Sequence, residues 1–161
     1  MKKPLMNLMT PDLWGLLVKF DEAGILNIKE VKRIVKEIAN ERLEFAKHYL
    51  DFAKSLLYKD MQYRNIISRS YYSMYHSARA AVFVQMHLDV HEHRNLVKRF
   101  KKVLRMRFKD ETQGVWLDYW RANRNRCDYN PYEEPTKELC EQAIDHAEVI
   151  YDTCKNLVEA L

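Results

Sequence analysis

The sequence predicts an all-α protein with one compact domain, and three observations support this. Its 161 residues include only three glycines and four prolines, fewer chain breaks than the turns of a sheet would need. Apolar side chains recur at intervals of three and four residues through most of the chain, which is the period of a helix face. With 47% hydrophobic side chains, a chain of this length can bury a substantial core.

The first two helices are predicted from the residues at their ends. Thr10 and Pro11 are typical of an N-cap and a first helical position, and Gly24 of a left-handed stop, which predicts a short helix ending near residue 23. Asn27 and Glu30 resemble a capping box that opens a long helix. The apolar stripe expected for this long helix comprises Ile28, Val31, Val35, Ile38, Arg42, Phe45, Tyr49, Phe52 and Leu56.

The helix predicted for residues 61–86 is expected to lie at the centre of the domain, because two of its faces carry side chains suited to burial. Lys59 and Asp60 should form the turn before it, so that it pairs with the preceding helix as an antiparallel hairpin. One face is ordinary core and comprises Ile67, Tyr71, Met74, Ala78 and Ala81. The other carries polar ends that need partners when buried, and comprises Arg69, Tyr72, His76 and Phe83, with Arg79 beside them.

Three further helices are predicted in the second half of the chain. Residues 92–108 combine an apolar stripe with a run of basic residues and no acid after the first position. Asp110 and Gln113 are expected to cap the next helix, and Thr136 to begin the last one. The basic residues predict a surface that attracts RNA backbone, nucleotide or an acidic partner, and the candidates are Lys98, Arg99, Lys101, Lys102 and Arg105.

Composition excludes several classes of protein. Cys127, Cys140 and Cys154 form an odd set without a Cys-x-x-Cys pair, which argues against a disulfide scaffold or zinc knuckle and predicts a reduced, cytoplasmic setting. No run approaches the roughly 20 apolar residues of a membrane helix, and no signal peptide is expected. No glycine-rich phosphate loop is present, so no cofactor is expected.

Metal binding is not expected from the histidines that lie close together in sequence. A metal site usually needs a defined geometry and a carboxylate or thiolate companion. Loop positions are therefore the simpler explanation for His87, His91 and His93.

Two sets of polar residues are candidates for a binding site. Arg69, Tyr72, His76 and Arg79 either fill the core with satisfied polar ends or form an anion pocket, since arginine forks suit phosphate. Arg124 occupies a core position and needs a carboxylate or a bound anion. It either pairs with Asp128 or converges with Arg69 and His76, and spacing alone leaves both possibilities open.

Ordered motifs give the chain a resemblance to a known family. AKHYLDFAKSLL at residues 46–57 resembles the family's lead helix, and ISRSYYSMYHSARA at residues 67–80 matches its pattern Ser-Arg-x-Tyr-Tyr-x-x-x-His-x-Ala-Arg. The later elements are His93 followed by Leu96 and Phe100, and Arg-x-x-x-Asp-Tyr at Arg124, Asp128 and Tyr129. Over residues 40–161 the chain therefore resembles the HEPN domain family, and residues 1–39 are expected to be an added N-terminal helical extension.

The resemblance implies an up-and-down bundle of four to five antiparallel helices, with an additional short N-terminal helix in this chain. It also implies a homodimer, often paired with a small nucleotidyltransferase as a toxin-antitoxin system. Exposed aromatic candidates, Trp14, Trp116 and Tyr119, fit a homodimer.

Catalytic members of the family are metal-independent ribonucleases with a His four to six residues after an Arg. Here the next His after Arg124 is His146, and Tyr129 stands where that His is needed. A non-catalytic module that binds nucleotide or RNA is therefore predicted, with ligand-binding residues Arg69, Tyr72, His76, Arg79, His93, Arg124, Asp128 and Tyr129. The alternatives are a ribonuclease that uses Arg124 with His76 or Tyr129, and a purely structural dimeric module.

Overall fold

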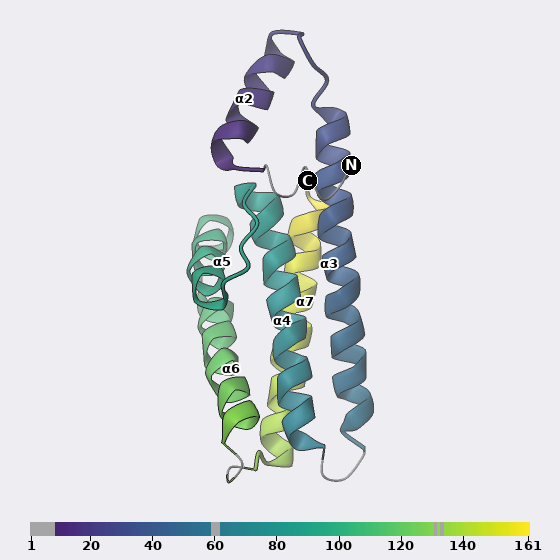
Figure 1. Ribbon diagram of the computed structural model, residues 1–161, viewed down its shortest axis with the longest axis vertical. Coiled ribbons are helices and arrows are strands. Elements are labelled where there is room, and N and C mark those ends of the chain that lie inside the picture. The colour runs from purple at the N-terminus through teal and green to yellow at the C-terminus, as the bar shows by residue number, and fades with distance from the viewer. Residues whose placement is uncertain (1–8, 59–61, 131, 133) are drawn as a thin grey trace.

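The computed structural model describes residues 9–58, 62–130, 132 and 134–161, and these residues form an all-helical bundle (Figure 1). Within this part of the chain there are six α-helices and no strand. They are α2 (Pro11–Glu22), α3 (Lys29–Leu56), α4 (Tyr63–Met86), α5 (His93–Phe108), α6 (Thr112–Tyr129) and α7 (Lys137–Glu159). The prediction of an all-α bundle with a short N-terminal helix is confirmed.

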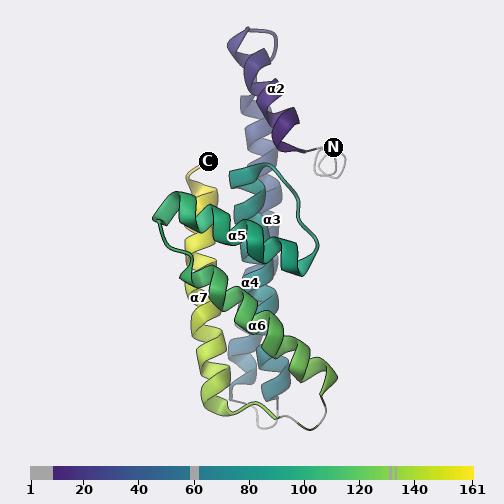
Figure 2. The ribbon, with the colours of Figure 1, turned by 90° about the vertical axis from the view of Figure 1, so that its left-hand side faces the viewer.

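Four segments run alternately down and up the bundle, and the third segment consists of two helices. α3 descends, α4 returns, α5 and α6 together lead back down, and α7 rises to the C-terminus (Figures 1 and 2). Figure 2 shows α5 lying across the bundle and α6 inclined to α4. α4 packs against α3, α5, α6 and α7, so it occupies the centre as predicted.

α4 is buried on most of its circumference, and its small side chains let the other helices approach closely. Tyr71, Met74 and Phe83 are fully buried in the main core, together with Phe100 of α5 and Trp120 of α6. The small buried residues of α4 are Ser70, Ser73, Ser77, Ala78, Ala80 and Ala81. Because transfer of apolar surface from water is the main favourable term in folding, this shared core dominates the stability of the bundle.

Helix ends were predicted correctly where one side chain supplies the cap. Thr10 Oγ1 accepts from Leu13 N at 3.1 Å, and Thr136 Oγ1 accepts from Leu139 N at 3.2 Å. Gly24 has φ of +68°, the left-handed conformation that favours glycine. The expected turn at Lys59 and Asp60 lies outside the described residues.

The capping box expected at the start of α3 is wrong. Ile28 is the N-cap, and its N–H donates to Asp21 Oδ1 at 3.0 Å. Asn27 Oδ1 accepts from Lys29 N at 3.0 Å, while Glu30 pairs with Arg33. At the start of α6, Asp110 Oδ1 accepts from Thr112 N at 3.0 Å, but Gln113 donates instead to Thr153 Oγ1 at 3.0 Å.

The apolar stripe predicted for α3 leaves the core in the second half of the helix. Phe45 is 60% exposed and Phe52 is 42% exposed, so this part of the prediction is wrong. The predicted stripe alternates steps of three and four, a period of 3.5 that drifts by about 20° per heptad on a straight helix. Leu56, the last residue of the predicted stripe, is buried as expected, and the other residues buried in this half of the helix are Leu43, Ala46, Leu50 and Ala53.

The N-terminal helix α2 has no buried residue of its own. It is joined to the bundle by Trp14, whose ring stacks on His87 with centroids 3.7 Å apart, and by the buried side chain of Met9. The expected boundary at residue 39 falls inside α3, which crosses it without a break. The division into residues 1–39 and 40–161 stays a prediction.

The burial of the cysteines and the hydropathy of the helices complete the description of the fold. Cys127, Cys140 and Cys154 are all buried. None of the helices in the described part of the chain is both long enough and apolar enough to span a membrane.

A pair of glycine substitutions tests the close approach of α5 and α6. A Cβ at Gly114 would overlap Lys101 Cγ and lie 3.3 Å from Lys101 Cα, whereas a Cβ at Gly15 meets nothing within 4 Å. We expect Gly114→Ala to lower the free energy of unfolding by about 1–3 kcal/mol through overpacking. Gly15→Ala should raise it by up to about 1 kcal/mol, because alanine is the better helix former. Urea denaturation measures both, and equal effects would contradict the packing described here.

Candidate functional site

Aromatic rings and arginines from three helices meet on one side of α4. We call this group the seam and define it as Tyr49 of α3, Arg69, Tyr72 and His76 of α4, and Arg124 of α6. The Tyr49 ring stacks on Tyr72 with centroids 5.6 Å apart, and on His76 with centroids 5.5 Å apart and planes 6° apart. The seam therefore joins four residues predicted to bind ligand with Tyr49, which was expected only as core.

Arg124 has two kinds of partner at once. Its Nη2 donates to Tyr72 Oη at 2.7 Å, and its Cζ lies 5.2 Å from the centre of the Tyr72 ring. Its Nε lies 2.6 Å from Asp128 Oδ2. The local pair with Asp128 and the approach to the polar face of α4 are thus not alternatives. One carboxylate holds the arginine in place while its Nη2 contacts the seam and its Nη1 donates to Asn125 Oδ1 at 3.1 Å.

Arg69 lies over ring faces at the other end of the seam. Its Cζ is 5.7 Å from the centre of the Tyr49 ring and 5.6 Å from that of Phe52. Its buried Nε has no hydrogen-bond partner among the residues that the structure describes. Ring faces attract the guanidinium through their quadrupoles, but they do not neutralise its charge. A cation is therefore available at this end of the seam.

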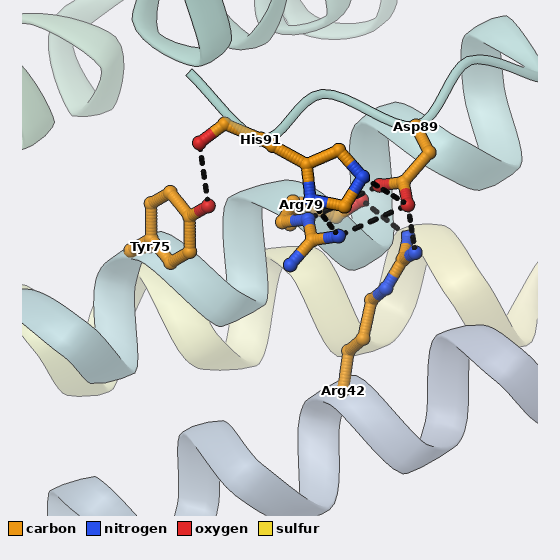
Figure 3. A network of polar contacts seen from close by, with 5 residues as sticks. All are labelled: Arg42, Tyr75, Arg79, Asp89 and His91. Carbon is orange, nitrogen blue, oxygen red and sulfur yellow. Dashed lines mark hydrogen bonds and ion pairs between the residues drawn. The ribbon is translucent and has the colours of Figure 1, made fainter. Parts of the chain in front are cut away.

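Arg79, which was expected beside the seam, belongs to a different cluster (Figure 3). We call this cluster the Asp89 clamp, and it consists of Arg42, Arg79, Asp89 and His91. Arg79 Nε and Nη2 lie 3.1 Å and 3.0 Å from the two oxygens of Asp89, and Arg42 Nη2 lies 2.9 Å from Oδ2. The Asp89 side chain is only 7% exposed. The side chains of Arg42 and Arg79, which are 7% and 13% exposed, thus share one buried carboxylate.

His91 and Tyr75 attach the chain between α4 and α5 to this clamp (Figure 3). His91 Nε2 lies 3.2 Å from Asp89 Oδ2, and His91 Nδ1 lies 2.9 Å from Arg79 Nη2. Tyr75 Oη donates to the carbonyl oxygen of His91 at 2.9 Å. Burial lowers the pKa of Arg42 to about 10, with Asp89 opposing this, so Arg42 remains a cation at neutral pH.

The two histidines of the candidate set are both held in the neutral form. Burial, followed by the charges of Arg79 and Arg42, lowers the pKa of His76 to about 4. Burial and then Arg124 lower the pKa of His93, whose Nδ1 shares a 2.5 Å hydrogen bond with Tyr71 Oη. Each ring lies among other aromatic rings, with Tyr75 beside both. With a pKa of about 4, His76 is not a base matched to neutral pH.

The remaining candidates are dispersed. Tyr129 is 78% exposed, so it lies open to solvent rather than enclosed with the seam. In the basic surface of α5, Arg105 Nη2 pairs with Glu111 Oε2 at 2.5 Å, and the Lys101 stem packs near Gly114. Lys98 and Lys102 are exposed and Arg99 is half-buried. An acid outside the basic run therefore offsets part of the charge that the sequence predicted.

The three histidines near the end of α4 take part in separate contacts. His87 stacks on Trp14, His91 joins the Asp89 clamp, and His93 bonds to Tyr71. Among the described residues, no group of three or more His, Cys, Asp or Glu side chains is arranged to hold a metal ion. Trp116, expected to be exposed, instead stacks on His146 with centroids 3.9 Å apart.

Sequence reasoning missed Asp89 and the partners of Arg42. Arg42 had been placed on the buried stripe of α3, where it is indeed 6% exposed. A charged residue on such a stripe is a signal, because a buried arginine requires a carboxylate. The sequence does not say which acid supplies it, since the acid lies in the connection before α5 rather than on a helix face.

The sequence is similar to one family model and to a curated protein. A model of the HEPN domain matches residues 39–157. A curated protein of Methanocaldococcus jannaschii, named "Putative toxin MJ0605", is 27% identical over 136 residues, which cover 84% of this chain and 94% of that protein.

Removal of the shared carboxylate tests the clamp. In Asp89→Asn the side chain keeps its shape but leaves two buried cations without their counter-ion, which should cost about 3–5 kcal/mol of unfolding free energy. The matched control is Glu30→Gln, in the exposed pair with Arg33, where we expect a change within about 0.5 kcal/mol. Urea unfolding distinguishes the two, and a small effect of Asp89→Asn would show that the clamp does not hold α3 and α4 together.

The depressed pKa of His76 predicts how stability depends on pH. The unfolded chain, with a pKa near 6.5, binds the proton more tightly than the folded protein, with a pKa of about 4. The free energy of unfolding should therefore fall as the pH decreases from about 6.5 toward 4. His76→Phe keeps an aromatic ring against Tyr49 and cannot titrate, so its melting temperature should fall less over this window. Identical pH profiles for the two proteins would contradict a buried, neutral His76.

Proposed function

Because the chain belongs to the HEPN domain family, we propose that it is a toxin-type HEPN protein whose seam binds single-stranded RNA or a nucleotide without cutting it. The relative named as a toxin supports the toxin-type assignment. The binding function rests on the geometry of the seam.

The observation that carries the proposal is that two arginines flank a stacked pair of tyrosines. Arg69 lies over Tyr49, and Arg124 lies over Tyr72 and donates to its hydroxyl. Base–aromatic stacking and arginine contacts are the two recurring features of single-stranded nucleic acid binding. Phe45 and Phe52 expose further ring surface on the same helix as Tyr49. Guanidinium forks suit phosphate oxygens, which would add the negative charge that this site lacks.

Binding without cleavage is favoured over ribonuclease activity by the chemistry around Arg124. General acid–base catalysis works best with a pKa near the operating pH. The pKa of His76 is about 4, that of His93 is lowered by burial and by Arg124, and Tyr129 stands where the family's catalytic His is needed. A ribonuclease using Arg124 with His76 or Tyr129 remains the enzyme alternative.

The partners that we propose are a second copy of the chain and a small nucleotidyltransferase. The similarity to a protein named as a toxin supports a toxin-antitoxin pair. Exposed apolar side chains on α5 and α6 support association, since apolar side chains left open to solvent can take part in an interface. They are Met106, Phe108, Val115 and Tyr119. The same surface supports the second candidate, a structural dimeric module without a ligand.

Ligand-dependent melting tests the binding function. At a concentration about a hundredfold above the dissociation constant, ATP or a short RNA should stabilise the native state by about 2.7 kcal/mol, a rise in melting temperature of about 5–10 °C. Arg124→Gln should abolish the rise, whereas Lys102→Ala on α5 should only weaken it. The wild-type rise should shrink with added salt.

Three results would count against the proposal. An unchanged melting temperature at millimolar ligand would favour the structural module, and a full shift in Arg124→Gln would show that the ligand binds outside the seam. Rapid cutting of single-stranded RNA in the presence of chelator, lost in Arg124→Gln, would favour the ribonuclease.

A further inference from the structure

The N-terminal helix α2 leaves an apolar surface open to solvent. Six of its twelve residues carry large apolar side chains, yet none of them is buried. Leu16 and Phe20 are 47% and 38% exposed, and they are neighbours because residues four apart lie on one face of a helix. Ile25 is 71% exposed, and its N–H donates to the carbonyl oxygen of Phe20 at 2.9 Å. We call these three residues the α2 patch.

The attachment of α2 to the bundle turns this patch outward. Trp14 faces the bundle, where its ring stacks on His87 at the end of α4. Leu16 follows two residues later, which is about 200° around a helix of 3.6 residues per turn. The family model begins at residue 39, so α2 lies outside the part of the chain that the family shares. The patch therefore belongs to an added element that has no packing partner on its outer side.

The charge of α2 limits what can cover the patch. The helix contains three acids, Asp12, Asp21 and Glu22, and one base, Lys19, so its net charge is −2. An RNA backbone and an anionic lipid surface would both be repelled by it. The partner that suits α2 is a protein surface that combines apolar contact with positive charge.

Helix α5 presents a surface of this kind. Arg94, Lys98, Lys102 and Met106 follow one another at intervals of four residues, and all four are exposed. They lie on one side of the helix, away from its buried residues, and we call them the α5 stripe. Like charges four apart on a helix repel one another, so an acidic partner would stabilise the stripe.

Acids of the same chain offset only part of this charge. Glu92 accepts from the backbone N–H groups of Arg94 and Asn95 at 2.9 Å and 2.7 Å, so it lies at the first cation of the stripe. The ion pair that α5 makes within the described residues joins Arg105 to Glu111 and leaves the α5 stripe outside it. One acid beside three cations leaves a positive surface that complements α2.

The positions of the two helices allow a second copy to cover both surfaces at once. α2 lies beyond α5 on the same side of the bundle, and Figure 2 shows that side facing the viewer (Figures 1 and 2). A two-fold axis that passes between the helices therefore brings α2 of each copy toward α5 of the other. The contact is then made twice in each dimer, whereas RNA bound to α5 would leave the α2 patch uncovered.

We propose that α2 is a docking helix, which packs the α2 patch and its acids on the α5 stripe of a second copy of this chain. This inference rests on the second copy named under the proposed function, and it adds the surface through which the two copies meet. The basic residues of α5 then serve association, and the contact with RNA stays at the seam.

The apolar part of the contact is tested by Leu16→Gln. Leu16 is exposed and glutamine is a good helix former, so the fold of each copy should not change. We expect the dissociation constant of the dimer, measured by sedimentation equilibrium, to rise about tenfold. The matched control is Val149→Gln, which changes a residue of α7 that is 44% exposed and lies outside the proposed contact. It should leave the dissociation constant unchanged.

The charged part is tested by reversing one charge on each helix. Asp12→Lys and Lys98→Glu should each raise the dissociation constant about three- to tenfold, because each places like charges opposite one another. The double variant should return it toward the wild-type value. Asp12→Lys also removes an acid from the first turn of α2, but a change on α5 would not reverse a loss of helix at that end.

The outcomes separate this inference from the proposed function. A wild-type chain that sediments as a monomer at all concentrations would overturn both the second copy and its contact, and would leave binding at the seam untouched. A dimer that Leu16→Gln does not weaken would overturn only the docking of α2. Weakening by the single charge reversals without recovery in the double variant would overturn the assignment of α5 as the surface that α2 meets.

Discussion

Arg42 of α3 and Arg79 of α4 share the carboxylate of Asp89, and the arrangement around α4 depends on this interaction. An arginine cannot lose its charge on burial, so each needs a counter-ion within reach. Asp89 lies after α4, and His91 and Tyr75 fasten the same connection. The clamp therefore fixes α3 against α4. It also fixes the connection that leads from α4 into α5. A buried ion pair of this kind contributes a defined register more than net stability.

That register determines which side chains meet on the exposed side of α4. Tyr49 of α3 lies against Tyr72 and His76 of α4. Arg124 then reaches the Tyr72 hydroxyl from α6. The result is a surface of ring faces with cationic ends, next to a histidine kept neutral by burial and neighbouring arginines. Such a surface is suited to holding a strand by stacking and charge, and it lacks a base poised for neutral pH.

The sequence predicted those features whose cause is local. Thr10 and Thr136 cap their helices because a cap needs only a side chain three residues away. The pair of Arg124 and Asp128, one of two possibilities that the sequence left open, forms because a helix brings residues four apart together. Phe45 and Phe52 were wrongly predicted to be buried. The apolar pattern in the sequence has a period of 3.5 residues, whereas a straight helix has 3.6 residues per turn. Asp89 was missed because its partners come from two other segments, and no periodic pattern reports a contact between distant parts of a chain.

The most direct test of a binding seam that does not cut RNA follows the arginine Nε–H resonances by NMR while single-stranded RNA is added. We expect the signals of Arg69 and Arg124 to move first, and the phosphorus spectrum of the RNA to keep only the signals of its original linkages. Arg69 is the sharper reporter, because its Nε has no hydrogen-bond partner among the described residues. Shifts confined to Arg99 and Arg105 of α5, or the appearance of new terminal or cyclic phosphate signals, would contradict this expectation.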